Sequence, residues 1–358
     1  MARRAADRIA DVRRLLQAAR TVIDHRAELV PAIVESTGLS TEGVELALAR
    51  HVEVEATDAE LSKLVSCAGD VSRVTVVLSA NVFVGALRAV ALARAASDDV
   101  VVRPSRRDPA FARALVDAAI GLGDTHVRID ETLDVASVEA GEIHVYGRDE
   151  TIADVRAKAR EGVRVQGHGS GMGVALVTAA AELAQAARGL AEDVVVFDQR
   201  GCLSPRIALV IGDETRAAAF ADALHAELDH LGGSIPRGDV PADERAASGR
   251  YIATMTYACR VLVGSQHAIG IAPPGAPLVL PPPYRHVHVA ACATIADAEK
   301  LLTPLAKAVV SIGSNDVEAA RTVARACPWA RLSALGMMQR PPLDGPVDGR
   351  GPSAHPEP

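Results

Sequence analysis

The feature that most constrains the fold is an alternation of Val-rich strands and Ala/Leu-rich helices, which runs from about residue 71 to about residue 330. Strands that alternate with helices in this way form βαβ units, whose strands pair in parallel. The sequence therefore predicts an α/β fold with twisted, mostly parallel sheets. The expected strands are residues 74–79, 98–105, 125–129, 142–147, 163–169, 194–197, 206–212, 286–292 and 308–313.

Residues 5–65 are expected to be helical. Apolar side chains recur there at a spacing of 3.6 residues, as in Ile9, Val12, Leu15 and Ala19, so they share one helix face. Aromatic residues make up only 3% of the chain against 49% hydrophobic residues, so the core must consist of Ala, Val and Leu. That composition is typical of Val-rich buried strands covered by helices.

Two domains and a tail are expected from the 358-residue length and from the change of pattern near Glu192. Residues 1–192 would carry N-terminal helices and a first α/β domain, and residues 193–330 a second α/β domain. Residues 331–358 are rich in Pro and Gly and are expected to be a partly disordered arm.

Charge and cysteine usage exclude several classes of protein. A net charge of −7 argues against nucleic-acid binding, which needs a basic surface. The five cysteines are scattered without a CxxC pair, so neither a disulfide framework nor a metal site is expected. The first residues lack the apolar core of a signal peptide, and no apolar run is suited to cross a membrane. We therefore expect a cytoplasmic protein that binds neither nucleic acid nor membrane.

His168, His267, His286 and His288 show no metal-ligand spacing either. His286 and His288 alternate along an expected strand and are predicted to lie on its surface.

The sharpest local motif runs from residue 194 to residue 206 and contains Cys202. An expected strand leads into a Gly-Cys turn, and Pro205 is expected to open a helix whose N-terminus would lower the pKa of the thiol. Arg200 and Arg206 would act in the same direction. The alternative is a small buried hydrophobic residue, as most free cysteines are.

A second motif is the glycine-rich segment that contains Gly167, His168, Gly169 and Gly173. It follows an expected strand and is expected to open a helix, as phosphate-binding turns do, although it misses the GxGxxG spacing. A tight connection between strand and helix is the alternative.

The third motif combines Arg103, Pro104 and Ser105 with Arg106 and Arg107 at the end of a strand. Guanidinium groups pair bidentately with phosphate, so this segment suits the ribose and phosphates of a nucleotide. A solvated basic loop is the alternative.

In this order and spacing, the three motifs resemble the aldehyde dehydrogenase superfamily. The chain looks most like the acyl-CoA reductases related to the fatty acid reductase of bacterial bioluminescence, and its ending at residues 335–342 is similar to a segment of that branch. The resemblance implies a Rossmann-type cofactor domain beside a second α/β domain that carries the catalytic thiol.

The resemblance also assigns catalytic roles. Cys202 stands in the place of the catalytic thiol, and Asn81 in the place of the asparagine whose amide helps to form the oxyanion hole. His168 is expected to donate a proton to the leaving group.

Cofactor contacts are implied at three places. Arg103, Pro104 and Ser105 match a Lys-Pro-Ser segment that contacts the ribose, with Arg in place of Lys. Gly147 matches the glycine that starts the turn over the pyrophosphate, where Arg148 replaces the usual Ser. Residues 167–171, with Gly167 and Gly169, occupy the position of a Glu-Leu-Gly-Gly segment.

Two departures from the superfamily affect the expected reaction. The glutamate that acts as the general base for thioester hydrolysis is absent from residues 167–171, and a second glutamate that holds the nicotinamide ribose is absent from residues 282–285. Loss of the hydrolytic base fits a reductase that exchanges acyl groups between thiols.

We therefore expect reduction of an acyl thioester such as acyl-CoA to an aldehyde, with NADPH (or NADH) as cofactor and a homo-oligomeric enzyme. The cluster of arginines around Arg103 favours NADPH, because a 2′-phosphate needs guanidinium neighbours. Three alternatives stay open: reduction of an acyl phosphate, oxidation of a free aldehyde, and a non-catalytic scaffold that has kept the fold.

Overall fold

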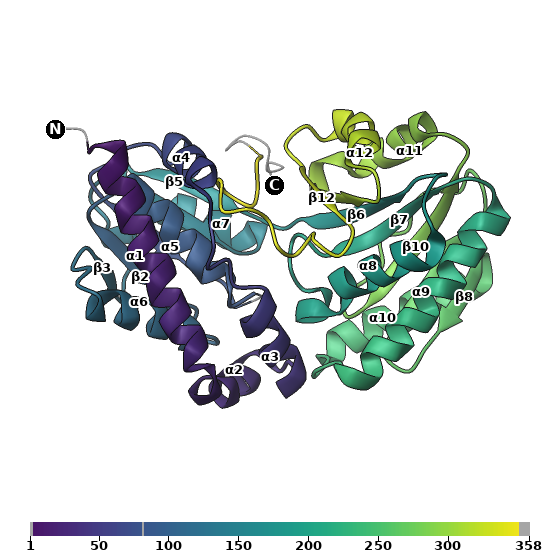
Figure 1. Ribbon diagram of the computed structural model, residues 1–358, viewed down its shortest axis with the longest axis horizontal. Coiled ribbons are helices and arrows are strands. Elements are labelled where there is room, and N and C mark those ends of the chain that lie inside the picture. Colours follow the sequence, from purple (N-terminus) through teal and green to yellow (C-terminus); the bar gives the residue numbers. More distant parts are fainter. Residues whose placement is uncertain (1–2, 81, 351–358) are drawn as a thin grey trace. The chain divides into compact units, whose positions relative to one another are not determined.

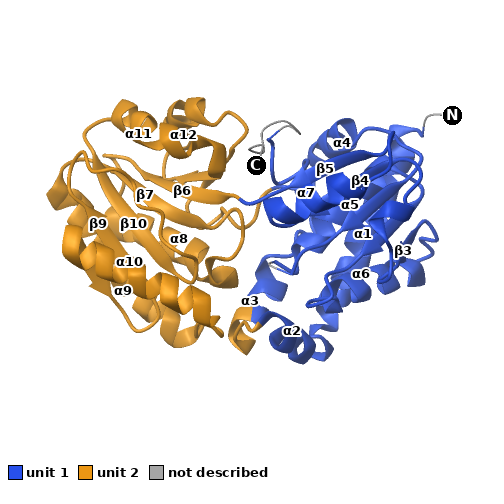
Figure 2. Cartoon of the chain, turned by 180° about the vertical axis from the view of Figure 1, so that it is seen from behind, with its two compact units in different colours: residues 1–37, 44–170, 342–358 blue, residues 38–43, 171–341 orange. Residues whose placement is uncertain are grey.

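The computed structural model describes residues 3–80 and 82–350. The chain forms two compact units (Figure 2). Unit 1 comprises Met1–Thr37, Val44–Ser170 and Pro342–Pro358, and unit 2 comprises Gly38–Gly43 and Gly171–Pro341. The chain thus passes from one unit to the other earlier than the expected boundary near Glu192, because the strand that follows Gly171 pairs within the second sheet.

Unit 1 is built on a parallel sheet with the strand order β3-β2-β1-β4-β5. The chain runs outward from β1 to β3 and starts again on the other side of β1 with β4. This reversal creates a topological switch point at the carboxyl ends of β1 and β4, where open α/β sheets bind ligands. The strands are β1 (Val74–Val77), β2 (Val100–Arg103), β3 (Val127–Ile129), β4 (Glu142–Tyr146) and β5 (Arg164–His168).

The helices of unit 1 bury Ala, Val and Leu, as the composition predicts. The apolar face expected for the first helix is confirmed, since Val12, Leu15 and Ala19 are fully buried where α1 packs against α5 and α6. Helix α5 also covers β1 and β2, and α7 covers β4 and β5 (Figure 1). The helices are α1 (Ala5–Asp24), α2 (Val30–Thr37), α4 (Asp58–Cys67), α5 (Gly85–Ala96), α6 (Ala110–Gly121) and α7 (Asp149–Lys158), with short 3₁₀ turns at Arg26–Glu28 and Val135–Ser137. Helix α3 (Thr41–Arg50) has residues in both units.

Unit 2 is built on a seven-stranded sheet with the order β12-β11-β6-β7-β10-β9-β8. All of its pairings are parallel except the β8–β9 hairpin, so the prediction of mostly parallel sheets is confirmed. The strands are β6 (Met172–Val177), β7 (Pro205–Ile211), β8 (Arg260–Val263), β9 (Ala268–Ala272), β10 (His286–Cys292), β11 (Val309–Ser314) and β12 (Arg331–Ala334).

Helices cover both faces of this second sheet. Alternate residues of β6 and β7 enter two separate cores, one beneath α8 and α9 and the other beneath α11 and α12. Both faces are therefore apolar, which explains why residues 174–177 of β6 and residues 207–211 of β7 are continuously apolar instead of alternating with polar residues. The helices are α8 (Leu183–Val195), α9 (Glu214–Ser234), α10 (Ala242–Ala258), α11 (Ile295–Leu302) and α12 (Val317–Val323), with 3₁₀ segments at Val196–Gln199, Thr303–Ala308 and Ala324–Ala326.

Three expected elements around the motifs are wrong. Residues 194–195 end helix α8 instead of forming a strand, because they complete an amphipathic face with Ala187 and Leu190. Pro205 opens strand β7 and not a helix. The glycine-rich segment likewise leads into strand β6, which lies between β7 and β11.

Asp108 does not cap α6: it accepts a hydrogen bond from the Ser36 hydroxyl (3.0 Å), and Pro109 takes the capping position without a side-chain bond. One further expectation needs correction. His286 and His288, expected on a surface, are 2% and 0% exposed. Strand β10 lies inside the sheet with helices on both faces, so neither of its faces reaches solvent.

Candidate functional site

The turn that carries Cys202 connects the end of α8 to the amino end of β7. After the 3₁₀ segment Val196–Gln199, the Ser204 N–H donates to the Gly201 carbonyl (3.1 Å) and closes a turn around Cys202. Cys202 is partly exposed, unlike Cys292 and Cys327. Burial raises the pKa of each of those two thiols to about 11, so they are inert near neutral pH. Cys202 is therefore not a small buried hydrophobic residue, which was the alternative interpretation of the sequence.

The segment before this turn is held in a rare backbone conformation. Phe197, Asp198 and Gln199 have φ values of 54°, 48° and 61°, and Tyr284 and Arg285 have φ values of 72° and 71°. Each such non-glycine residue costs about 1–3 kcal/mol and persists only when its surroundings hold it. Strain of this kind concentrates at functional sites.

Buried polar contacts hold the strained segment. The Asp198 carboxylate pairs with the Arg285 guanidinium (Oδ1–Nη2 2.7 Å) and accepts the Gly238 N–H (2.9 Å). The Gln199 amide donates to the carbonyls of Pro205 and His286 (2.7 Å each) and accepts the His286 N–H (2.9 Å). Strand β7, strand β10 and the Cys202 turn are thereby fixed to one another.

Gly173, at the start of β6, lies directly against the same turn. Its N–H donates to the Ser204 carbonyl (2.9 Å), and a Cβ atom at this position would overlap the Leu203 carbonyl oxygen. The glycine-rich motif thus contributes to the thiol turn through Gly173, by allowing a close backbone approach.

A further segment packs on this glycine. Met338 contacts the Gly173 position and is itself fixed by Asp193, which accepts the N–H groups of Gly336 (2.7 Å) and Met338 (2.9 Å). Burial raises the pKa of Asp193 to about 7, and the backbone donors oppose the shift. The ending that resembles the acyl-CoA reductases therefore supports the thiol turn from inside unit 2.

In unit 1, the predicted cofactor residues follow the carboxyl ends of parallel strands. Arg103 ends β2, is partly buried and donates to the Leu133 carbonyl (3.3 Å). Burial lowers its pKa, and the nearby charge of Arg106 lowers it further. Pro104 is buried, Ser105 is partly buried and accepts the Arg107 N–H (3.3 Å), and Arg106 and Arg107 are exposed.

Gly147 and Arg148 lie between β4 and α7, at the switch point of the sheet. Arg148 is the N-cap residue of α7. Asp149 is the first residue of this helix and accepts the Ser170 N–H (3.1 Å). The free N–H groups and dipole of a helix N-terminus favour an anion such as a pyrophosphate.

Gly167, His168 and Gly169 lie at the carboxyl end of β5 in unit 1. A Cβ atom on Gly167 would come within 2.6 Å of Ile152 Cγ2, so the glycine lets α7 pack on β5. The His168 ring stacks on Tyr146 at 4.3 Å between ring centres. Arg350 donates to the Ser170 carbonyl (2.8 Å), which ties this segment to the last described residues.

A cavity of about 180 Å³ opens in the same region of unit 1. It is lined by residues from β4, β5 and the C-terminal segment, among them His144, Gln166, His168, Asp348 and Arg350.

Arg103, Ser105, Gly147 and Arg148 therefore gather at one edge of the unit 1 sheet. These residues fit a dinucleotide, because they combine the switch point of the sheet, a helix N-terminus and the half-buried guanidinium of Arg103 beside the positive charge of Arg106. Asn81 lies outside the described residues.

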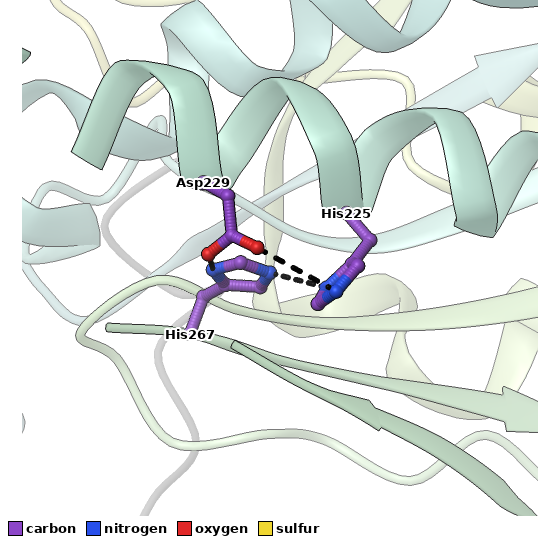
Figure 3. Close-up of side chains that lie close together, drawn as sticks. All are labelled: His225, Asp229 and His267. Carbon is purple, nitrogen blue, oxygen red and sulfur yellow. Dashed lines mark hydrogen bonds and ion pairs between the residues drawn. The ribbon is translucent and has the colours of Figure 1, made fainter. Parts of the chain in front are cut away.

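A group that the sequence analysis missed lies in unit 2. His225, Asp229 and His267 bring two imidazoles and a carboxylate to within 4.8 Å of one another (Figure 3). The spacing of His225 and Asp229 on a helix was a usable signal, since residues four apart share a face. Their partner His267 comes from a hairpin that the sequence analysis did not predict.

Comparison with solved structures defines the class of protein. The chain is similar to a benzaldehyde dehydrogenase of Corynebacterium glutamicum, with 16% identity and a TM-score of 0.68 over 97% of this chain and 83% of that one. A propionaldehyde dehydrogenase of Clostridium phytofermentans gives 15% identity and a TM-score of 0.65, over 94% and 84% of the two chains. The fold is thus that of the aldehyde dehydrogenases, as the resemblance implied.

The sequence then defines the family within this class of proteins. The profile of the family described as acyl-CoA reductase (LuxC) matches residues 69–351, and the chain belongs to this family of oxidoreductases. It is also 25% identical over 183 residues to a long-chain acyl-protein thioester reductase of Aliivibrio fischeri. That match covers 48% of this chain and only 38% of the relative. Among the described residues, no helix has the length and apolar character needed to cross a membrane.

Proposed function

We propose that this protein reduces an acyl thioester to an aldehyde with NAD(P)H, through an acyl group carried on Cys202. The proposal rests mainly on the turn that contains Cys202. The Cys202 side chain is partly exposed, the residues before the turn have a strained backbone, and the turn packs closely against Gly173. Family membership and the fold support the same chemistry.

In the first step, the Cys202 thiolate attacks the thioester carbonyl carbon. The carbon–sulfur bond to the departing thiol then breaks, and that thiol leaves as a thiolate that takes a proton. The Cys202 N–H and, by resemblance, the Asn81 amide stabilise the oxyanion, and one such donor contributes about 3 kcal/mol. His168 is proposed to supply a proton to the leaving group.

A nicotinamide cofactor, when bound, supplies the hydride that converts the acyl group to the aldehyde level. Its ribose and phosphates would be held by the Arg103–Ser105 segment and by Gly147 and Arg148 at the N-terminus of α7. The exposed guanidinium groups of Arg106 and Arg107 favour NADPH, since a 2′-phosphate needs cationic neighbours. Release of the aldehyde then breaks its bond to sulfur and restores the Cys202 thiolate.

Hydrolysis of the acyl-Cys202 group is disfavoured by the composition of residues 167–171, which hold no carboxylate. Water attack at neutral pH needs a general base, whereas exchange between thiols of similar leaving ability does not. We therefore expect reduction and thiol exchange to outrun formation of free acid.

The covalent step is tested by intact-mass measurement after incubation with acyl-CoA and no cofactor. The wild type should gain one acyl group, and Cys202→Ser should gain none. Cys259→Ser is the matched control, because Cys259 is partly exposed as well and should be dispensable. An adduct that survives in Cys202→Ser would refute the role of this thiol.

The substrate class is tested by cofactor consumption with acyl-CoA, acyl phosphate or free aldehyde. We expect acyl-CoA to consume NADPH and release aldehyde. Consumption with acyl phosphate alone, or reduction of NADP⁺ by free aldehyde alone, would identify the alternative enzymes. An absence of adduct and turnover with every donor would identify a scaffold.

A homo-oligomer is also proposed, on the resemblance alone, and light scattering of the full chain tests it. The cytoplasmic location expected from the sequence stays a prediction.

A further inference from the structure

Helix α9 and the β8–β9 hairpin bring three metal-ligating side chains together in unit 2. His225 and Asp229 lie one turn apart on α9, so they project from the same face. His267 is the last residue of the loop between β8 and β9 and faces both of them (Figure 3).

The distances within this group are short. His225 Nδ1 lies 2.8 Å from His267 Nε2, and Asp229 oxygens lie 3.6 Å from His225 Nε2 and 3.8 Å from His267 Nδ1. Two imidazoles and one carboxylate are a donor set that zinc binds, usually with water in the fourth position. Ligand atoms around a tetrahedral zinc ion lie about 3.4 Å apart, which is close to the distances between the Asp229 oxygens and the two imidazoles. The His225 side chain is 30% exposed, so solvent reaches this side of the group.

His267 is the buried member of the group. It is 3% exposed, and among the described residues its Nδ1 atom has no hydrogen-bond partner. A buried polar nitrogen without a partner is unfavourable by about 1–3 kcal/mol and calls for an explanation such as an ion.

The hairpin loop is shaped around the His267 ring. A Cβ atom on Gly264 would overlap that ring and come within 2.8 Å of Asp229 Oδ1. On the other side of the loop, Gln266 accepts the Arg237 N–H and donates to the Gly232 carbonyl (3.2 Å). The loop is therefore fixed with the imidazole directed towards α9.

We propose that His225, Asp229 and His267 form a binding site for a zinc-type transition-metal dication. The ion joins α9 to the β8–β9 hairpin, and the exposed side of the group leaves a coordination position for water or an external ligand. This site is independent of the reductase chemistry, which uses Cys202.

The test is a titration of the metal-free full chain with Zn²⁺ against a chromophoric chelator. We expect one equivalent of Zn²⁺ bound, and at least about tenfold weaker binding in His225→Gln and in Asp229→Asn, since even indirect changes around a metal site lower affinity 10–100-fold. His230→Gln is the matched control, because His230 is an exposed neighbour on the same helix. Its affinity should equal that of the wild type.

A thermal measurement gives a second readout. Zn²⁺ at a hundredfold excess over its Kd should raise the unfolding midpoint of the wild type by about 5 °C. The same addition should leave the midpoint of His225→Gln unchanged. Both tested ligands are at least partly exposed, and the midpoint without metal shows that each variant is folded.

Two results would overturn the proposal. One is a wild type that binds no stoichiometric Zn²⁺, which would leave a plain hydrogen-bonded histidine pair. The other is a bound equivalent that is lost in Cys202→Ser and kept in His225→Gln, which would place the ion on a thiolate.

Discussion

At the scale of single residues, the position of the Cys202 thiol depends on the space that neighbouring residues leave open. Gly173 has no Cβ, and the Leu203 carbonyl occupies that space. The Cys202 turn can therefore lie against β6, and any larger residue would displace the backbone beside the thiol.

We predict that Gly173→Ala slows acylation of Cys202 at least about tenfold, because a displacement of about 1 Å near reacting atoms can reduce a rate a hundredfold. Stopped-flow measurement of acyl transfer checks this. Gly233→Ala is the control: a Cβ there meets no atom within 4 Å, and in helix α9 the change should stabilise the protein slightly. Equal rates in the Gly173→Ala variant and the wild type would contradict the prediction.

Arg106 is the residue on which the choice of cofactor can be tested. It is exposed and close enough to Arg103 to lower its pKa. We predict that Arg106→Ser raises the KM for NADPH about tenfold, the loss of one charge-assisted hydrogen bond, and leaves the KM for NADH unchanged. Arg20→Ser, an exposed change on α1, controls for net charge. A similar loss with both cofactors would show that Arg106 does not contact the 2′-phosphate.

At the scale of elements, strand β10 makes unit 2 sensitive to acid. Burial lowers the pKa of His288 to about 4, against about 6.5 for an unfolded chain. Between these values the unfolded state binds the proton and the folded state does not, so stability is present above pH 6.5 and is lost as the pH falls towards 4. One histidine accounts for up to roughly 3 kcal/mol of this loss.

Urea unfolding at pH 7 and pH 5 measures this effect. We predict that the free energy of unfolding falls less between these pH values in His288→Asn than in the wild type. His126→Asn, a change at an exposed histidine, should behave as the wild type does. If the free energy of unfolding fell by the same amount between pH 7 and pH 5 in all three proteins, His288 would not be the group that titrates.

The elements also show how much of the fold can be predicted from the sequence. The positions of α1, β7 and β10 are predicted correctly, because apolar residues at a 3.6-residue spacing mark a helix and short runs rich in β-branched residues mark strands. The run at residues 194–197 is not, because Val-rich stretches form strands or buried helix ends equally well. Residues 194 and 195 are helical because they pack with Leu190 and its neighbours in the core beneath the sheet, and the local sequence does not show this packing.

The candidate site follows the same rule. The motifs around Cys202 and Arg103 are recognisable from local order, whereas the pairing of Asp198 with Arg285 joins residues 87 positions apart. Nothing local marks His225 and His267 as neighbours either, since a hairpin brings them together.

At the scale of the whole molecule, each unit has its own core and its own buried ion pairs. In unit 1, Arg94 and Asp124 are both fully buried and pair at 3.0 Å between Nε and Oδ2. Removing one partner of such a pair leaves an uncompensated charge and destabilises by about 3–5 kcal/mol.

We predict that Asp124→Ala speeds hydrogen exchange in α5, α6 and β3 and leaves β6, β7 and β10 of unit 2 protected as before. Asp117→Ala, an exposed change on α6, should alter neither set. Loss of protection that spreads equally through both sheets would show that the two units unfold as one.

The return of residues 342–350 to unit 1 has a consequence for synthesis on the ribosome. The buried Arg88 guanidinium donates to the carbonyls of Pro342 (2.8 Å) and Gly345 (2.6 Å), which are translated after every residue of unit 2. A chain that ends directly before residue 342 therefore holds every residue of unit 2, while the buried Arg88 in unit 1 lacks both of these acceptors.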